Sequence, residues 1–401
     1  MTPIVQRGTG EGVWFAPGRA NLMGEHTDYN DGFVLPFALA QGTTATVAQR
    51  DDAVLTLTSH QRPGPPIEVA LEDLAPGAIT GWAAYPAGVA WALREAGVKV
   101  PGASIAIDSD VPPGAGLSSS AALECAVALA LTELAGAAIP RRELAALARR
   151  AENEFAGVPS GIMDQSASLL GRAGHALLLD CQSGQTSQVP FTARLLIINT
   201  RAKHDLTAGE YGARRAECEE AARQLSVPTL RFITNCGDTS RLRDPILRKR
   251  ARHICTDNER VLRAVTLLRD GKYAEVGPLL TQAHASLRDD FEISWPEADV
   301  AVEAAVTAGA LGARMIGGGF GGSVLALVPD DRPAIRAAVT TAVAAAFAAR
   351  AWTAPEFLDA IPSAGARRLT LRPPLARSGY PHAASAPGRD GPAAGATPQP
   401  V

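Results

Sequence analysis

Apolar and polar residues alternate along some stretches of the chain, and apolar residues recur three or four positions apart along others. The first pattern predicts strands and the second predicts helices. In the first half of the chain they predict four strands and four helices. The strands are expected at 43–49, 53–59, 103–110 and 175–181, and the helices at 82–96, 119–134, 141–155 and 162–170.

The second half opens with the apolar run ARLLIINT at 193–200, which predicts a buried strand. This half is richer in helices. Helices are expected at 207–224, 246–270, 273–287 and 332–349, and further strands at 323–328 and 366–373. Because strands and helices do not alternate strictly, we predict an α+β fold with mixed sheets and helices, and not a doubly wound sheet.

The chain of 401 residues is long enough for two domains. We place the boundary near residue 187, which gives an N-terminal domain at 1–187 and a C-terminal domain at 188–374. From Pro374 onward Pro, Gly, Ala and Ser dominate, so 375–401 is predicted to be a disordered tail.

Composition and charge exclude little. Hydrophobic residues make up 46% and charged residues 20% of the chain, and the net charge is −3, so neither nucleic acid nor an anionic membrane is favoured as a partner. A neutral sugar would suit this balance. The five cysteines have no metal-ligand spacing, and the N-terminus does not resemble a secretory signal, so we expect free thiols in a cytoplasmic protein.

The stretch APGRANLMGEHTDYNDGFVLPFAL at 16–39 is unusually polar between apolar flanks. Six of its polar residues fall within twelve positions, and burying them without partners would cost stability. This density therefore indicates a hydroxyl-rich or otherwise polar ligand. The six are Arg19, Glu25, His26, Asp28, Tyr29 and Asn30.

A glycine and serine loop at 108–126, DSDVPPGAGLSSSAALECA, joins a predicted strand to a predicted helix. Gly114 and Gly116 permit positive φ, and the helix start offers free N–H groups to a phosphate. A serine that only caps the helix is the alternative. The loop matches neither the GxxxxGK[ST] nor the GxGxxG pattern, so a nucleotide here would be held in another way.

Two carboxylates lie beside the breaker GVPSG. Glu152 is predicted in the last turn of one helix, where the negative dipole end disfavours it unless a cation is near. Asp164 is predicted in the first turn of the next helix, where the ionised form is favoured; there a plain cap is the alternative. Farther on, five glycines within 317–322 precede a strand, which indicates that something approaches the backbone closely.

These motifs resemble those of one kinase family. PPGAGLSSSAAL and GGGFGG resemble the phosphate loop and the third motif of the small-molecule kinases that include mevalonate and homoserine kinases. GRANLMGEHTDYNDGFVLP resembles the galactokinase signature, and AENEFAGVPSGIMDQ and RAKHDLTAGEYGARRAECEEA are also galactokinase-like. The similarity runs from about Phe15 to Arg372. It implies two α/β domains with the active site in the cleft between them.

The resemblance implies ATP-dependent phosphorylation of the C1 hydroxyl of α-D-galactose, with ATP and Mg²⁺ required. Asp164 is the expected catalytic carboxylate and Arg19 its cationic partner. Asp164 could act as a base that removes the proton or as a stabiliser of the transition state, and both roles remain open. Ser120 and Glu152 match the Mg²⁺ ligands. The expected sugar-binding residues are Glu25, His26, Asp28, Gly161 and Tyr211. The expected ATP-binding residues are Trp82, Gly114, Ala115, Gly116, Leu117, Ser118, Ser119 and Ser120.

Alternatives of other classes stay open. A kinase for N-acetylgalactosamine or L-arabinose would differ around C2 and C5, which one sequence does not resolve. A non-catalytic galactose sensor would be expected to lack Asp164, Arg19 or part of GLSSSAAL, and all are present. A mevalonate- or homoserine-type kinase leaves GEHTDYN unexplained. We expect a monomer, with no nucleic-acid or membrane partner.

Overall fold

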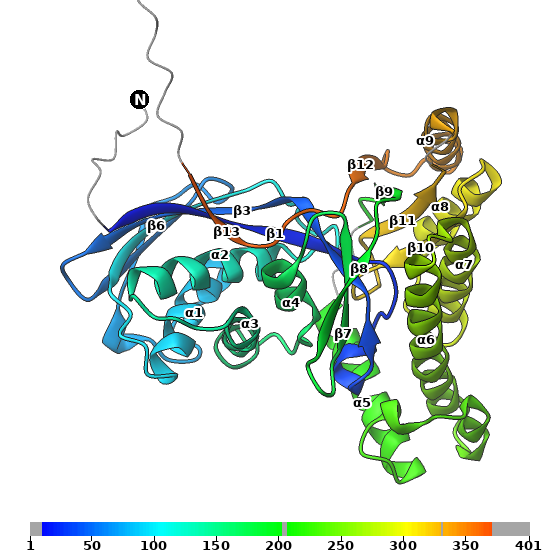
Figure 1. The fold of residues 1–401 in the computed structure, drawn as a ribbon, viewed down its shortest axis with the longest axis horizontal. Coiled ribbons are helices and arrows are strands. Elements are labelled where there is room, and N and C mark those ends of the chain that lie inside the picture. Colours follow the sequence, from blue (N-terminus) through cyan, green and yellow to red (C-terminus); the bar gives the residue numbers. More distant parts are fainter. Residues whose placement is uncertain (1–9, 203–206, 330–331, 371–401) are drawn as a thin grey trace, which may run out of the picture. The chain divides into compact units, whose positions relative to one another are not determined.

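The computed structural model describes residues 10–202, 207–329 and 332–370, so the tail predicted at 375–401 lies outside the described residues. A six-stranded sheet has the order β13-β1-β3-β6-β4-β5, and all of its strands except β13 come from the first 110 residues (Figure 1). Its strands are β1 (Glu11–Asn21), β3 (Pro36–Arg50), β4 (Val54–Ser59), β5 (Ile67–Ala70), β6 (Gly102–Ser109) and β13 (Arg367–Leu369). β4 pairs with β6 in parallel and the other pairs are antiparallel, so the sheet is mixed.

Helices cover one face of this sheet (Figure 1). They are α1 (Ala84–Glu95), α2 (Ser119–Leu134), α3 (Arg141–Arg150) and α4 (Met163–Leu170). α2 packs against β1 and β3 on one side and against the other three helices on the other. Its side chains from Ala121 to Thr132 are buried all round, as expected of a helix enclosed on every side.

β1 carries an irregularity that sequence pattern alone did not predict. Its pairing with β3 shifts register between Pro17 and Arg19, which forms a β-bulge. A bulge is one of the places in a strand where proline is tolerated. A Cβ at Gly18 would lie 2.6 Å from the carbonyl oxygen of Leu117, so glycine is needed for the loop before α2 to approach the strand. The bulge therefore joins the polar opening stretch to the phosphate loop.

The second half contains a four-stranded antiparallel sheet in the order β10-β11-β9-β12, with helices packed against it (Figure 1). Its strands are β9 (Arg194–Asn199), β10 (Gly312–Ile316), β11 (Ser323–Val328) and β12 (Glu356–Ala360). Its helices are α5 (Thr207–Leu225), α6 (Pro245–Arg269), α7 (Tyr273–Asp289), α8 (Pro296–Thr307) and α9 (Pro333–Ala348). All residues of β10 and β11 are buried, which matches their nearly continuous apolar sequence.

A small third sheet, β2-β7-β8, ties the polar opening stretch to the rest of the fold. β2 (Phe33–Val34) pairs with β7 (His175–Asp180), which pairs with β8 (Thr186–Pro190). The backbone N–H of Phe33 also donates to Asn258 Oδ1 of α6 at 2.8 Å. The opening stretch is thus held from both halves of the chain.

The predicted α+β class with mixed sheets is confirmed, and the predicted helices and strands are present. α2 and β11 have the predicted bounds. The helix predicted at 141–155 is different: its regular part ends at Arg150 and the chain continues as one π-helical turn, Ala151–Phe155. Such turns are rare and occur often at functional sites. Seven strands and α-helices in the described residues were not predicted: β1, β2, β5, β8, β10, β12 and α8.

The expectation of free cysteines is wrong for two of the five. Cys236 and Cys255 form a disulfide, because the short helix Cys236–Arg241 packs against α6 and brings their Cα atoms to 5.6 Å. The other three cysteines are free, and two of them are buried. Separately, none of the helices in the described part of the chain is long and apolar enough to span a membrane.

Candidate active site

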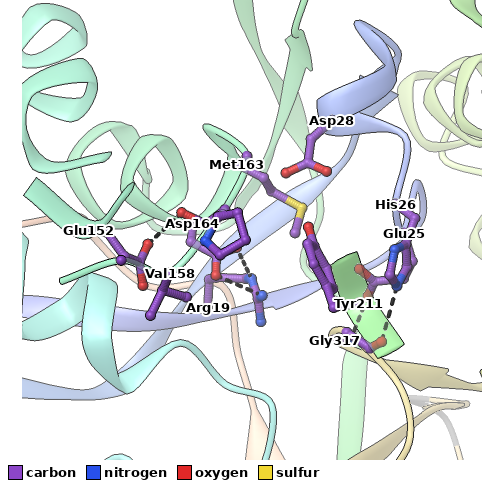
Figure 2. Close-up of a pocket in the computed structure, with 15 residues that line it drawn as sticks. Arg19, Glu25, His26, Asp28, Glu152, Val158, Met163, Asp164, Tyr211 and Gly317 are labelled. Atoms are coloured by element: carbon purple, nitrogen blue, oxygen red, sulfur yellow. Dashed lines mark hydrogen bonds and ion pairs between the residues drawn. The ribbon is translucent and has the colours of Figure 1, made fainter. Parts of the chain in front are cut away.

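A cavity of about 340 Å³ collects the polar residues singled out in the sequence (Figure 2). Every residue predicted to be catalytic or sugar-binding lines it, together with Glu152. Its lining consists of Arg19, Glu25, His26, Asp28, Glu152, Gly157, Val158, Pro159, Ser160, Gly161, Met163, Asp164, Tyr211, Gly317 and Gly318. The first and second halves of the chain both contribute to the wall.

Arg19 and Asp164 form a two-point ion pair in this cavity (Figure 2). The guanidinium donates from Nε to Asp164 Oδ1 at 2.7 Å and from Nη2 to Oδ2 at 2.9 Å. Nη1 donates to the carbonyl oxygen of Gly116 at 2.6 Å, and Ser118 Oγ donates to Asp164 Oδ2. Burial opposes the charge on Arg19, but Asp164 and Glu25 outweigh it and hold the pKa of Arg19 above its usual range. The carboxylate is therefore fixed in orientation.

Local structure brings the two partners together. Asp164 lies in the first turn of α4, as predicted, where free N–H groups favour a carboxylate. Arg19 follows the bulge in β1, and its own backbone N–H donates to the carbonyl oxygen of Leu117 at 3.0 Å. The bulged strand, the phosphate loop and the start of α4 thus meet at one ion pair.

Asp28 lies against the backbone of Gly161. A Cβ at position 161 would fall 1.7 Å from Asp28 Oδ2, so only glycine lets the carboxylate take this place. Burial, with the nearby charge of Asp164, raises the pKa of Asp28 to about 6. A carboxylate in this position is an acceptor for hydroxyl groups of a ligand in the cavity.

Glu25 is buried and reaches across to the second half of the chain. Its Oε1 accepts a hydrogen bond from the backbone N–H of Gly317 at 2.9 Å and lies 3.1 Å from Arg314 Nη2. Burial raises the pKa of Glu25, and the charges of Arg314 and Arg19 oppose that rise. This carboxylate links the opening stretch to the third glycine motif.

His26 makes a second link to the same motif. It has a left-handed backbone, with φ 61°, and its Nε2 lies 3.1 Å from the carbonyl oxygen of Gly318. Burial lowers the pKa of His26 to about 3, so the ring is neutral and donates from Nε2 while Nδ1 accepts from the Tyr29 hydroxyl at 2.8 Å. Tyr211 packs on this ring with a centroid distance of 4.9 Å. His26 and Tyr211 therefore form one aromatic wall.

The two glycine motifs contact each other through their backbones. Gly116 and Gly317 have φ of 72° and 86°, and a Cβ built on Gly317 would lie 3.2 Å from the carbonyl oxygen of Gly116. Ser323 Oγ, at the start of β11, donates to the carbonyl oxygen of Ala115 at 2.7 Å. This close approach accounts for glycine at positions 317 and 322, where a Cβ would lie 3.2 and 3.3 Å from carbonyl oxygens of the phosphate loop.

The predicted ATP-binding residues separate into two environments. Trp82, Ser119 and Ser120 line a second cavity of about 790 Å³. Gly114 and Gly116 line a third, of about 1170 Å³. Ala115 and Leu117 have buried side chains, so only their backbones are available to a phosphate, and the Ser118 hydroxyl is engaged by Asp164.

Glu152 lies in the π-helical turn and is held by three neutral donors. Ser120 Oγ donates to its Oε1 at 2.8 Å, and Ser160 Oγ and Gln165 Nε2 donate to its Oε2 at 2.6 and 2.7 Å. Burial, with the negative charge of Asp164, raises the pKa of Glu152. A carboxylate and a hydroxyl oxygen in contact suit Mg²⁺, which prefers oxygen ligands, so these residues fit that ion.

Some residues of the site escaped the sequence reasoning. Ser160 and Gln165 lie within the galactokinase-like motif AENEFAGVPSGIMDQ, but the resemblance predicts no role for them. Arg314 lies 289 positions along the chain from Glu25, with which it pairs. The position of Ser160 between Gly157 and Gly161 was the one available signal for it. Arg314 offered none, because a buried arginine is recognised only once its partner is known. Part of the motif quoted at 201–221 lies outside the described residues.

Three family models match separate segments of the chain. Residues 6–49 match the family described as the galactokinase galactose-binding signature. Residues 84–172 match the GHMP kinases N terminal domain, and residues 264–345 match the GHMP kinases C terminal domain.

Curated relatives and solved structures are similar over most of the chain. A galactokinase of Streptomyces coelicolor is 51% identical over 90% of this chain and 94% of its own, and one of Mycobacterium tuberculosis is 46% identical over 85% and 97%. The structure of Lactococcus lactis galactokinase complexed with galactose has a TM-score of 0.86 at 34% identity, covering 90% of this chain and 96% of its own. Methanococcus jannaschii mevalonate kinase has a TM-score of 0.65 at 16% identity, covering 90% and 100%, and is similar in fold.

Proposed function

The chain belongs to the galactokinase branch of the GHMP kinase family, and from that premise we propose how its residues divide the reaction among them. The protein is an ATP-dependent kinase that transfers the γ-phosphoryl group of ATP to the C1 hydroxyl of α-D-galactose. The product is galactose 1-phosphate. The alternatives of a related sugar or a sensor receive no support from the relatives.

Galactose is placed in the cavity of about 340 Å³, beside Asp28. Asp28, held against Gly161, accepts hydrogen bonds from sugar hydroxyls. Glu25 uses Oε1 for the third glycine motif and offers Oε2 to the sugar. His26 has both ring nitrogens engaged, by Tyr29 and by the Gly318 carbonyl oxygen, so it shapes the wall of the cavity. Tyr211 closes the same side. A polar cavity of this kind gains its last partners when the sugar binds.

Asp164 is the catalytic carboxylate and Arg19 its partner. Phosphoryl transfer passes through a loose transition state, so the attacking hydroxyl needs orientation more than early deprotonation. Asp164, held by Arg19 and Ser118, orients the C1 hydroxyl. It accepts the hydroxyl proton late, after the bond between the γ-phosphorus and the departing ADP has loosened and as the C1 oxygen bonds to that phosphorus. Arg19 stabilises the negative charge at this point.

The loop at 114–120 receives the phosphates of ATP through its backbone N–H groups and the Ser119 hydroxyl, and Trp82 packs against the adenine. Ser120 and Glu152, which are hydrogen-bonded to each other, would hold Mg²⁺. When bound, this ion would neutralise negative charge on the phosphates of ATP. The neutral hydrogen-bond donors around Glu152 leave the negative charge of its carboxylate available to the cation.

The observation that carries this proposal is a single cavity in which a two-point Arg19–Asp164 pair faces residues of the matched galactose-binding signature. An ATP-coupled assay with galactose, N-acetylgalactosamine, L-arabinose and glucose tests it. We expect galactose to have the highest kcat/KM. If another sugar of the panel had a higher kcat/KM, that sugar would be assigned as the substrate, and the roles proposed for Asp164 and Arg19 would stand.

We also propose a monomer that works in the cytoplasm, with a domain boundary near residue 187. Gel filtration coupled to light scattering tests the monomer, and a dimer mass would contradict it. Cell fractionation tests the location. Limited proteolysis tests the boundary, because cleavage within the loop between the domains would release two stable fragments.

A further inference from the structure

Glu124 is a buried carboxyl group to which the proposed reaction assigns no role. It lies on α2, where the neighbouring inward positions are alanine, leucine, valine and cysteine, and its exposed fraction is 0%. An apolar side chain would avoid the cost of burying a carboxyl group there. Burial, with the charge of Glu152 nearby, raises the pKa of Glu124 well above its usual range. The residue therefore costs free energy and needs a compensating contact.

That contact is Gln165 of α4. Its Nε2 donates to Glu124 Oε2 at 3.1 Å and, at the same time, to Glu152 Oε2 at 2.7 Å. A flipped amide would bring its carbonyl oxygen against both carboxyl groups, which repel it. Two acceptors on one side thus fix which end of the Gln165 amide faces Glu152. A protonated Glu124 still accepts from Gln165 Nε2 through its carbonyl oxygen, so this hydrogen bond does not require the ionised form.

The helix α2 consequently holds both oxygens of Glu152. Ser120 and Glu124 are four residues apart and lie on the same face of α2. Ser120 reaches Glu152 Oε1 directly, and Glu124 reaches Oε2 through Gln165. Gln165 also directly follows Asp164 on α4. The same bridge therefore sets the position of Glu152 relative to the catalytic carboxylate.

We propose that Glu124 is a positioning residue for Glu152, acting through the Gln165 amide to keep that carboxylate in the orientation that binds Mg²⁺. This inference rests on the proposed assignment of Ser120 and Glu152 as the metal ligands. Residues behind a metal ligand commonly change metal affinity or activity about 10-fold to 100-fold when they are replaced. Glu124 touches neither the sugar nor the cation in this arrangement.

The test compares Glu124→Leu with Glu124→Gln. Leucine fills similar space without an acceptor, whereas glutamine keeps a carbonyl oxygen for Gln165 Nε2. We expect Glu124→Leu to raise the Mg²⁺ concentration for half-maximal kcat about 10-fold. Glu124→Gln should stay within about twofold of wild type, as an acceptor is retained. The galactose KM should be unchanged in both.

A binding measurement gives a readout apart from turnover. Isothermal titration calorimetry of the non-hydrolysable analogue AMP-PNP, with and without saturating Mg²⁺, gives the factor by which the cation tightens binding. We expect that factor to fall about 10-fold in Glu124→Leu and to be kept in Glu124→Gln. Thr132→Val is the matched control, because Thr132 is also a buried polar residue of α2. It should leave both readouts at wild-type values.

Wild-type Mg²⁺ dependence in a folded Glu124→Leu variant would overturn the inference, as would equal losses in the leucine and glutamine variants. If Glu124→Leu does not fold, Gln165→Leu cuts the same bridge and should show the same loss; unchanged Mg²⁺ dependence there overturns it equally. Glu152→Gln separates a failure of the proposed metal assignment from a failure of the role proposed for Glu124. If it too leaves Mg²⁺ dependence unchanged, the metal assignment fails; if it alone weakens Mg²⁺, only the role of Glu124 fails.

Discussion

Asp164 and Glu152 line the same cavity but are held in opposite ways (Figure 2). Asp164 receives two hydrogen bonds from the Arg19 guanidinium, so its negative charge is balanced within the protein. Glu152 receives its hydrogen bonds from two hydroxyl groups and an amide, all of them neutral. The protein therefore orients both carboxylates but neutralises the charge of one.

In the proposed mechanism the two carboxylates obtain their counter-charge from different sources. A paired carboxylate keeps a constant geometry through the reaction, which suits a group that orients the sugar hydroxyl. A carboxylate fixed by neutral donors stays attractive to an external divalent ion, which arrives with ATP. Burial raises the pKa of Glu152, as expected for a carboxylate that has no cationic side chain as its partner.

Among the substitutions that test this comparison, Asp164→Asn should cause the largest loss of kcat. The amide keeps the shape but loses the charge and the ability to take the proton, so kcat should fall about 10³-fold to 10⁴-fold. Galactose binding, followed by calorimetry, should be kept within a few-fold. The surface pair Arg336–Asp359 has the same two-point geometry, so Asp359→Asn is the control. Turnover near wild type in Asp164→Asn would remove Asp164 from catalysis.

Arg19→Lys tests the two-point geometry itself. A lysine ammonium keeps the charge but cannot donate to both oxygens of Asp164 and to the Gly116 carbonyl in one plane. We expect kcat to fall about 100-fold, with a smaller change in the galactose KM. Arg336→Lys, at the exposed pair with Asp359, should leave steady-state kinetics unchanged. Equal kinetics for Arg19→Lys and wild type would mean that charge alone is needed.

Glu152→Gln tests the second half of the comparison. The amide keeps one acceptor oxygen but no charge, so the Mg²⁺ concentration for half-maximal activity should rise about 10-fold. The galactose KM should change little, because the sugar side of the cavity is untouched. Glu154→Gln, two residues on and paired with Arg150 at the surface, is the control. A magnesium titration that superimposes on wild type would contradict the metal assignment.

Asp28 is a third carboxylate in the cavity, and its response to pH gives the smallest expected effect. Its pKa is raised to about 6, so it is ionised above that pH and protonated below it. Galactose affinity that depends on the ionised form is present above pH 6 and is lost as the pH falls through it. The galactose KM should be about twofold higher at pH 6 than at pH 8. Asp28→Asn should bind weakly, with a flat profile between these values.

Much of the fold could be predicted because local sequence determines it. α2 begins within a run of three serines and is mostly apolar, and β11 is an apolar run after a glycine cluster, so both have the predicted bounds. β1 escaped prediction because Pro17 and Gly18 are typical of a turn, and here they occupy a bulge. The π-helical turn at 151–155 escaped because no local pattern distinguishes it from the end of an ordinary helix.

The sequence determined which chemical groups are available to the site, and the tertiary structure determined how they are arranged. Motif resemblance was enough to propose roles for Asp164, Arg19, Asp28 and Glu152, and all four line one cavity. Which of them pair depends on contacts between segments far apart in the chain: Arg19 with Asp164, and Glu25 with Arg314. No period or spacing encodes such contacts, because they follow from packing two sheets and their helices around one cavity.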